Sequence, residues 1–492
     1  MDPVGARSKG RWLGLDVGTS SVKALLVTSG GIVEGRASVA YPSNYGLGGE
    51  AEQEPQTYLE AARRAIAECG ATTGALDGIG LAGQTPTIVL VAANGAAVRQ
   101  ALTWQDHRAD AEARELADTY GPAEPLFGTD LPWTSGYIPA KLLWLARHEP
   151  KSVAATRWVL QPKDFVGLTL TGSPASDPWS SKGLCNVKTS APVAEVLAGT
   201  GWPAKVVPPL AQAWEARGAV TSRPAARFGL PEGTPVSVGW SDALAGMLAI
   251  GAFDEPTGFV LAGTSSIVGM STTDPPRSSK PLLEIPAACA PLPVLYGPTE
   301  AGGASIEWLA RLLGREPREV LELAAAATGT DGAPVFVPYL AGERAPIWRT
   351  DVRAVLLDLS LEHGAEDLAR AVVTGVCLSE LHVLATAEEQ LGRAAGEVHV
   401  AGLGALAAPW REARLAVLAR PLHLLDEPNA SALGAAILGA AAANGAELGA
   451  ALELRGQGEL AVPALSKAQA AERGLARYLR ATEVSRRWAD QR

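Results

Sequence analysis

The residues of this chain best suited to chemistry are an aspartate and a short turn that occurs twice. The string Gly-Thr-Ser-Ser occupies positions 18–21 and again positions 263–266, about half of the 492-residue chain apart. Each copy follows an apolar run, at Leu13–Val17 and at Gly258–Ala262, so both are predicted to be tight turns between strands. Backbone N–H groups in such turns can point at an anion, as in many phosphate sites. The repeat therefore predicts two related lobes that bind one phosphorylated ligand.

The aspartate is Asp16, two residues before Gly18 in the pattern Asp-x-Gly-Thr. A carboxylate at this place can hold Mg²⁺ beside a phosphate, directly or through water. The alternative is an aspartate that only stabilises the turn. The repeat of the turn favours the metal role. In the second copy Ala262 precedes Gly263 and no acidic residue is near, so the metal is expected in one lobe only.

A second aspartate, Asp242, follows a predicted strand over 235–239 and precedes a predicted helix over 243–250. The structural alternative for Asp242 is the N-cap of that helix. In the functional interpretation its carboxylate takes a proton from a substrate hydroxyl as a phosphoryl group arrives. Its place just before a predicted hinge at Gly251–Pro256 favours the functional role, and the two roles are compatible.

The elements around these residues alternate between strands and helices. Those expected in the first half are strands over 12–17, 22–28 and 32–41, a helix from Pro55, a strand over 78–82, and a hairpin from segments 87–92 and 98–103. The order strand, strand, strand, helix, strand is similar to that of the actin-like, ribonuclease-H-like ATPase domain.

A glycine-rich string late in the chain is close to a dinucleotide-binding fingerprint. A predicted strand over 398–401 runs into Gly402-Leu403-Gly404-Ala405-Leu406-Ala407, a helix follows to Ala419, and Asp426 lies about twenty residues on. Alone, this pattern would suggest a nicotinamide-dependent dehydrogenase. Because the first lobe has no matching unit and two phosphate turns come earlier, we expect the string to hold a nucleotide base instead.

Composition bears on partners and location. Hydrophobic residues make up 47% and charged residues 19%, as in ordinary globular proteins with two large domains. The formal charge of −10 provides no net basic field for a nucleic acid. The apolar stretch Ala432–Ala443 is far shorter than the roughly 20 residues that cross a bilayer, so no membrane partner is expected. The 4 cysteines are far apart, which favours reduced thiols and a cytoplasmic location.

Taken together, the chain resembles the FGGY family of carbohydrate kinases, and most closely its xylulokinase branch. The resemblance runs from about Trp12 to Ala443 and is carried by ordered strings, which include Gly14-Leu15-Asp16-Val17-Gly18-Thr19-Ser20, Leu81-Ala82-Gly83-Gln84, Thr103-Trp104-Gln105-Asp106-His107-Arg108, Lys141-Leu142-Leu143-Trp144, Gln161-Pro162-Lys163-Asp164, Gly263-Thr264-Ser265, Gly342-Glu343-Arg344-Ala345-Pro346 and Ala432-Leu433-Gly434-Ala435-Ala436. It implies an α/β fold of two ribonuclease-H-like (actin-like ATPase) domains with a cleft between them.

The resemblance also implies an activity, the transfer of the γ-phosphoryl group of ATP, with Mg²⁺, to a hydroxyl of a small sugar or polyol. It makes Asp242 the proton acceptor and places Asp16 at the metal. The implied nucleotide contacts are Gly18, Thr19, Ser20, Gly263, Thr264, Ser265, Gly402, Leu403 and Gly404. The implied substrate contacts are Gln84, Thr85, Trp104, Asp106 and Asp242. Trp104 could equally be a core residue, and Asp106 could form a surface ion pair with Arg108.

The expected domains are an N-terminal lobe over 11–251 with the sugar, the metal and the first turn, a C-terminal lobe over 252–465 with the second turn and the adenine site, and a helical tail over 466–492. The oligomeric state stays open, a homodimer included. A kinase of another substrate, of the erythritol, ribulose, glycerol or gluconate type, is the alternative function. A non-sugar actin-like ATPase and a non-catalytic sugar sensor are more distant alternatives, which polyol-dependent ATP turnover would exclude.

Some positions depart from the family pattern. Thr85-Pro86 stand where xylulokinases have a Met-His pair that touches the sugar, and Leu403 replaces a glycine on the adenine side. Asp358 replaces a glycine of the second family signature, and Ile138 departs from the first. Because the imidazole is missing and Pro86 has no N–H, we predict that D-xylulose is a poor substrate and that another ketose or a linear polyol is preferred.

Overall fold

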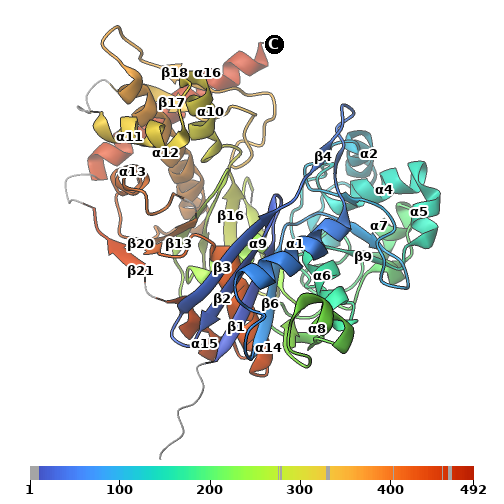
Figure 1. Ribbon diagram of the computed structural model, residues 1–492. Helices are drawn as coiled ribbons and strands as arrows, with labels where there is room; N and C mark the ends of the chain where they lie inside the picture. Colours follow the sequence, from blue (N-terminus) through green and yellow to red (C-terminus); the bar gives the residue numbers. More distant parts are fainter. Residues whose placement is uncertain are drawn as a thin grey trace, which may run out of the picture. The chain divides into compact units, whose positions relative to one another are not determined.

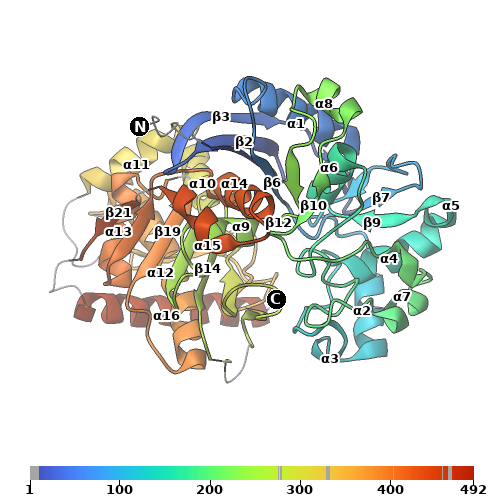
Figure 2. The same ribbon diagram turned by 90° about the horizontal axis from the view of Figure 1, so that it is seen from below.

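The computed structural model describes residues 10–274, 276, 280–327, 333–402, 404–456, 458–463 and 468–491. The chain forms two compact units, each with a seven-stranded sheet (Figure 1, Figure 2). Unit 1 comprises Met1–Ala249, Ile285–Pro291 and Asn429–Gly456, and unit 2 comprises Ile250–Glu284, Leu292–Pro428 and Gln457–Arg492. The sequence changes unit between Ala249 and Ile250, beside the predicted hinge.

The sheet of unit 1 is mixed, with parallel pairs around β6 and antiparallel pairs on both sides of them. Its order is β10-β11-β6-β1-β2-β3, and β12 also pairs with β6. The strands are β1 (Arg11–Val17), β2 (Ser21–Thr28), β3 (Ile32–Ala40), β6 (Gly78–Gly83), β10 (Ala216–Ala219), β11 (Pro235–Ser237) and β12 (Trp240–Ser241). β1 runs antiparallel to β2 and parallel to β6, and β12 also runs parallel to β6. The strands predicted over 12–17, 22–28, 32–41 and 78–82 are confirmed.

Helices cover both faces of this sheet. α1 (Pro55–Glu68) packs with Tyr58 and Ile66 on the face of the sheet that carries Leu15. On the other face, where Gly14 and Gly80 lie, α14 (Ala430–Ala443) comes so close that a Cβ on Gly80 would stand 1.5 Å from the carbonyl oxygen of Ala435. The absence of side chains there allows the approach. Both views show the red helix α14 against the blue strands of unit 1 (Figure 1, Figure 2), although its sequence position had suggested the second lobe.

The remainder of unit 1 consists of two small sheets and several helices. Its elements are the sheet β4 (Asn44–Tyr45), β5 (Ala51–Gln53) and β8 (Ala101–Leu102), the pair β7 (Val89–Val91) and β9 (Trp158–Leu160), and the helices α2 (Asp110–Tyr120), α3 (Glu124–Phe127), α4 (Ile138–His148), α5 (Pro150–Ala155), α6 (Pro162–Thr171), α7 (Ala194–Gly199), α8 (Ser222–Phe228), α9 (Asp242–Ala249) and α15 (Leu448–Ala451). The predicted hairpin across Asn94-Gly95 is reduced to isolated bridges, because β7 pairs with β9 and β8 pairs with β5.

Unit 2 repeats the pattern of unit 1 in its sheet, whose order is β15-β16-β14-β13-β19-β20-β21. The strands are β13 (Gly258–Ala262), β14 (Ser266–Ser271), β15 (Leu283–Ile285), β16 (Val294–Pro298), β19 (Val398–Gly402), β20 (Leu422–Leu425) and β21 (Gly458–Ala461). β13 runs antiparallel to β14 and parallel to β19, as β1 runs with β2 and β6. The two halves of the chain therefore start with the same strand pattern, as the repeated turn predicts.

The helices of unit 2 form its core with this sheet. They are α10 (Ala304–Leu313), α11 (Pro317–Ala326), α12 (Ala365–Leu391), α13 (Ala408–Leu418) and α16 (Ala468–Asp490), and β17 (Val335–Val337) pairs with β18 (Val355–Leu357) beside them. By length and composition α12 could cross a membrane, but 72% of its most apolar window is buried inside the protein, as in a core helix. The helix expected as a tail, α16, buries Tyr478 in the same core.

Candidate active site

The carboxyl ends of three neighbouring strands bring Asp16, Gln84 and Asp242 to one edge of the unit 1 sheet. Asp16 is the next-to-last residue of β1, Gln84 directly follows β6, and Asp242 directly follows β12. β1 and β12 both run parallel to β6. Sites in open α/β sheets form at such carboxyl ends. Two aspartates from distant parts of the sequence thus face one region.

Asp16 is almost fully buried, with 2% of its surface exposed. Its Oδ2 lies 3.5 Å from Nζ of Lys23 on β2, while its Oδ1 is buried and accepts no hydrogen bond within the described residues. Burial raises the pKa of Asp16, and Lys23 opposes that shift. A buried carboxylate oxygen without a partner is costly. Such an oxygen fits a Mg²⁺ ion or a water bound to it.

Asp242 is the first residue of α9 and is partly exposed. The cap role considered as the alternative for Asp242 is filled by its neighbour, because Oγ of Ser241 accepts a hydrogen bond from the N–H of Leu244 at 3.4 Å. Oδ1 of Asp242 accepts from the N–H of Ala243 at 2.7 Å. Burial, and then the charge of Asp16, raise the pKa of Asp242 to about 7. A carboxylate with this pKa can accept a proton near neutral pH.

A buried lysine, Lys182, acts on Asp242 through its charge. Burial lowers the pKa of Lys182 to about 8, against the opposing effects of Asp177 and Asp242. Lys182 in turn lowers the pKa of Asp242. Lys182 was not predicted from the sequence, because a lone lysine in a loop is part of no motif.

The turn after β1 uses part of its backbone for its own closure. The N–H of Gly18 donates to the carbonyl oxygen of Ser21 at 3.0 Å, and the N–H of Gly263 donates to that of Ser265 at 3.0 Å. The glycine N–H groups are therefore not available to an anion, contrary to the expectation. Within the described residues no hydrogen bond uses the N–H groups of Thr19 or Ser20. These groups can still bind phosphate.

Thr19 connects the turn with the predicted substrate side. Nε1 of Trp104 donates to Oγ1 of Thr19 at 3.0 Å, and Nε2 of Gln53 donates to the Thr19 carbonyl oxygen at 2.6 Å. The hydroxyl of Tyr41 donates to the carbonyl oxygen of Gly18. Trp104 is partly exposed and is therefore not a core residue.

Gln84 is buried and its side-chain amide is engaged by other protein groups. Nε2 of Gln84 donates to Oε1 of Gln53 at 2.8 Å, and Oε1 of Gln84 accepts from the hydroxyl of Thr87 at 3.0 Å. Gln53 was not singled out from the sequence, although it holds both Thr19 and Gln84. Thr85, next along the chain, is partly exposed.

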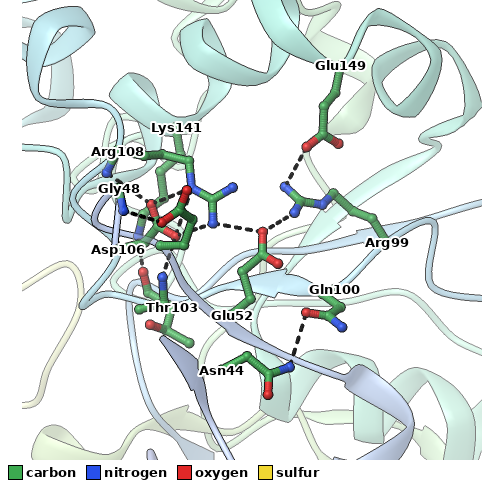
Figure 3. Close-up of polar contacts among 12 residues, drawn as sticks. Asn44, Gly48, Glu52, Arg99, Gln100, Thr103, Asp106, Arg108, Lys141 and Glu149 are labelled. Carbon is green, nitrogen blue, oxygen red and sulfur yellow. Dashed lines mark hydrogen bonds and ion pairs between the residues drawn. The ribbon is translucent and has the colours of Figure 1, made fainter. Parts of the chain in front are cut away.

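Asp106 lies in a buried network of charges (Figure 3). Its carboxylate accepts from Nη2 of Arg108 at 2.8 Å and from the N–H of Ala51 at 2.9 Å, and Arg108 also contacts Glu52 at 2.8 Å. Figure 3 shows this chain continuing through Arg99. The ion pair considered for Asp106 and Arg108 is therefore present, but it is buried rather than at the surface, because Asp106 has 0% of its surface exposed.

Lys141 holds the loops around the predicted substrate side. Its Nζ donates to the carbonyl oxygens of Pro86 at 3.2 Å, Thr103 at 2.7 Å and Gly136 at 2.8 Å. Burial lowers the pKa of Lys141 to about 7. The three donors of one ammonium group thus fix the segments that carry Thr85 and Trp104.

In unit 2 the two predicted nucleotide strings meet at the carboxyl ends of β13 and β19. Gly402 pairs in register with Ala262, which directly precedes Gly263. The φ angle of Gly402 is +112°, and a Cβ there would stand 1.9 Å from the carbonyl oxygen of Ala262, so only glycine fits. Gly404 also has a positive φ, of +84°. Leu403 lies outside the described residues.

The amino end of α10 closes on the second turn. The N–H groups of Gly302 and Ala304 donate to the carbonyl oxygen of Thr264 at 2.8 and 3.1 Å. The N–H group of Gly303 donates to the carbonyl oxygen of Gly263 at 2.9 Å. The pair Gly302-Gly303 was missed, although a Gly-Gly pair before a predicted helix is a signal for a close backbone approach.

A buried ion pair fixes the second turn to the helices behind it. Ser266, the last residue of the repeated string, donates through its hydroxyl to Oε1 of Glu380 at 2.7 Å. Nε of Arg414, on the α13 helix that follows the Gly402–Gly404 string, lies 2.8 Å from Oε2 of Glu380. The side chains of Glu380 and Arg414 are 0% and 3% exposed.

Two of the departures from the family pattern have local explanations. Asp358 has a φ of +63°, a conformation that favours glycine but that aspartate adopts more readily than most residues. Its carboxylate pairs with Nη2 of Arg477 on α16 at 2.7 Å. Ile138 is fully buried at the start of α4.

Comparison with known proteins agrees with this arrangement. Residues 11–249 match the N-terminal domain of the FGGY family of carbohydrate kinases, and residues 258–443 match its C-terminal domain. The chain is 27% identical over 441 residues to a xylulose kinase of Bacillus subtilis, with 87% of each chain covered. It is 25% identical to a gluconokinase of the same organism, with 87% and 86% covered. The solved xylulose kinase of Rhodospirillum rubrum has a TM-score of 0.85 at 27% identity, with 98% and 100% covered.

These matches confirm the expected α/β fold with two ribonuclease-H-like domains. They span both halves of the chain and include both Gly-Thr-Ser-Ser turns and both aspartates. The chain therefore belongs to the FGGY family of carbohydrate kinases and is an ATP-dependent sugar kinase.

Proposed function

We propose that this kinase phosphorylates a hydroxyl of a small ketose or polyol and that Asp242 accepts the hydroxyl proton. The observation that carries the proposal is the pair of carboxylates at neighbouring strand ends, in which burial and the charge of Asp16 raise the pKa of Asp242 to about 7. Most aspartates are too weakly basic for this task near neutral pH. The environment of Asp242 supplies the required basicity.

In the proposed reaction the substrate hydroxyl oxygen attacks the γ-phosphorus of ATP, and its proton moves to a carboxylate oxygen of Asp242. A bond forms between the sugar oxygen and phosphorus, and the bond between the γ-phosphorus and the bridging oxygen breaks, which releases ADP. Asp16 would hold Mg²⁺, whose charge offsets the negative charge on the transferred phosphoryl group. The N–H groups and hydroxyls of Thr19 and Ser20 would bind phosphate oxygens in unit 1.

Unit 2 is proposed to bind ATP through the strings that meet at the ends of β13 and β19. Thr264 and Ser265 would contact phosphate, and Gly402 and Gly404 would let the adenine approach the backbone closely. The register pairing of Gly402 with Ala262 supports this, because it places both strings at one sheet edge. Leu403, which lies outside the described residues, is proposed to border the base.

The substrate is proposed to lie beside Asp242, near Thr85 and Trp104. Gln84 and Asp106 are proposed to position this site rather than to bind the sugar through free polar atoms, because their polar side-chain atoms already bond within the protein. The B. subtilis relatives, a xylulose kinase and a gluconokinase, support a ketose or a sugar acid as the class to test. The absence of an imidazole at Thr85-Pro86 favours a substrate other than D-xylulose.

The experiment is an ATP-consumption screen of the purified enzyme with Mg²⁺ over D-xylulose, ribulose, gluconate, glycerol and erythritol. We expect ADP release that depends on one of these acceptors, and Asp242→Asn should lower kcat by at least roughly 10²-fold while nucleotide affinity is retained. Ala243→Ser, one residue along α9, serves as the matched control. Acceptor-independent ADP release, or full turnover by Asp242→Asn, would contradict the proposal.

A further inference from the structure

The first residues of β19 and β20 carry a cluster of one carboxylate and two imidazoles that the kinase reaction does not use. Glu397 directly precedes β19, His399 lies two residues further along, and His423 is in β20. Side chains two residues apart on a strand share a face. His399 also pairs in register with His423 on the neighbouring parallel strand. The three side chains therefore converge on one face of the unit 2 sheet.

The distances within this cluster suit metal ligands. Oε1 of Glu397 lies 3.1 Å from Nε2 of His399, and Oε2 lies 2.8 Å from Nε2 of His423. One ligand atom from each residue can be chosen so that all lie within 4.8 Å of one another. Ligands of a tetrahedral ion with bonds of about 2.0–2.2 Å stand a little over 3 Å apart, so small side-chain rotations would suffice.

The hydrogen bonding of His399 leaves its Nε2 as the ring nitrogen that can bind a cation. Its Nδ1 contacts the carbonyl oxygen of Ile250, which can only accept, so Nδ1 carries the proton. In the neutral imidazole Nε2 is then an unprotonated acceptor, yet it faces Oε1 of Glu397 at 3.1 Å. Two acceptors at this distance repel each other unless a proton or a metal ion lies between them. An imidazole that donates its other N–H to a backbone carbonyl is the usual arrangement around a bound metal.

The cluster is also accessible to an ion. The side chains of His399, Glu397 and His423 are 17%, 34% and 40% exposed, so an ion can enter and keep a water molecule.

We propose that Glu397, His399 and His423 form a binding site for a divalent transition-metal ion such as Zn²⁺. Two imidazoles and one carboxylate suit Zn²⁺, Cu²⁺ or Ni²⁺, whereas Mg²⁺ prefers ligand sets made only of oxygen. A bound ion ties the start of β19 to the start of β20. β19 ends at Gly402, so the ion stabilises the strand that leads to the proposed nucleotide string.

The test is a Zn²⁺ titration of the full chain, without a histidine tag and after chelator treatment, in millimolar Mg²⁺. We expect one equivalent of Zn²⁺ to bind, and Co²⁺ to give the visible absorption of a low-symmetry site. His423→Gln and Glu397→Gln should each weaken binding by at least about tenfold. His363→Gln, which removes a histidine of unit 2 outside the cluster, should bind like the parent. The chain has 6 histidines, so the His399→Gln, His423→Gln double variant keeps the other four.

Thermal unfolding gives a second readout that does not depend on kinase activity. One equivalent of Zn²⁺ should raise the Tm of the parent by about 2 °C or more and leave that of His423→Gln unchanged. Without metal the two proteins should melt alike, because His423 is partly exposed. Absence of saturable binding by the parent, or equal binding by the parent and the double variant, would overturn the proposal. Neither outcome bears on the roles proposed for Asp16 and Asp242.

Discussion

The indole Nε1 of Trp104 donates a hydrogen bond to Oγ1 of Thr19 at 3.0 Å. This bond joins a residue proposed to border the sugar with one proposed to bind phosphate. Thr19 can accept from Trp104 and still donate its own proton to a phosphate oxygen. The threonine hydroxyl thus links the two substrates of the proposed reaction.

The first prediction follows from this link. Thr19→Val keeps the branched shape of the side chain but removes the hydroxyl. It should therefore weaken the binding of Mg-ATP and the binding of the sugar, each by about tenfold or more. Thr264 has no such indole partner in the described residues, so Thr264→Val should weaken the binding of Mg-ATP alone. Titration with a non-hydrolysable ATP analogue measures the effect on nucleotide binding, and the KM of the sugar reports the effect on sugar binding. Thr19→Ser, which keeps the hydroxyl, is the control. If Thr264→Val binds nucleotide like the parent, the repeat of the turn is only structural.

The second prediction concerns pH. The pKa of Asp242 is raised to about 7, so kcat/KM should fall as the pH drops through about 7 and the base is protonated. Lys182 lowers that pKa, so Lys182→Met should move the acid limb to higher pH, whereas Lys188→Met, at an exposed lysine of the same segment, should not. The pH profile of kcat/KM for each protein is the measurement. An unchanged limb in Lys182→Met would exclude this electrostatic role.

The third prediction concerns Lys141. Lys141→Met leaves the carbonyl oxygens of Pro86 and Gly136 without their donor and that of Thr103 with only the N–H of Asp106, which should lower the free energy of unfolding by about 2 kcal/mol or more. The Tm should fall by about 3 °C or more, and the sugar KM should rise because the loops of Thr85 and Trp104 lose their anchor. Lys151→Met, at an exposed lysine, is the control for calorimetry. A Tm within a degree of the parent would contradict the proposed role.

The fourth prediction concerns the substrate. A site built to bond a particular hydroxyl rejects analogues strongly, because buried polar groups are then left unpaired. This chain has Pro86 where xylulokinases have a histidine that touches the sugar. The kcat/KM for D-xylulose should therefore lie below the ordinary enzymatic range, which starts at about 10⁴ M⁻¹s⁻¹. The double change Thr85→Met with Pro86→His should raise it relative to other acceptors. If the parent protein already reaches that range, other side chains make the sugar contact of the missing histidine, and D-xylulose is an ordinary substrate of this kinase.

Local patterns in the sequence were enough for the strands around the two Gly-Thr-Ser-Ser turns, but not for the hairpin predicted across Asn94-Gly95. Alternating apolar residues predict β1 to β3, and Gly-Thr-Ser-Ser after an apolar run predicts the two turns, because turn and strand preferences are properties of neighbouring residues. The family follows from strings such as Asp16-Val17-Gly18-Thr19. Even so, the same four residues form hairpins of different length, since Val17 pairs with Val22 but Ala262 pairs with Ser266.

The tertiary structure decided which side chains meet and what each is free to do. The sheet order places Asp16 beside Asp242, and their proximity together with burial raises the pKa of Asp242, an effect that no local string encodes. The same packing uses Asp106 and Gln84 for bonds within the protein. It also brings His423 next to Glu397 through the register of β19 and β20. Long-range pairing depends on the whole fold, so the sequence alone determined the family and predicted the reacting residues, while the tertiary structure decided the electrostatics and the partners of those side chains.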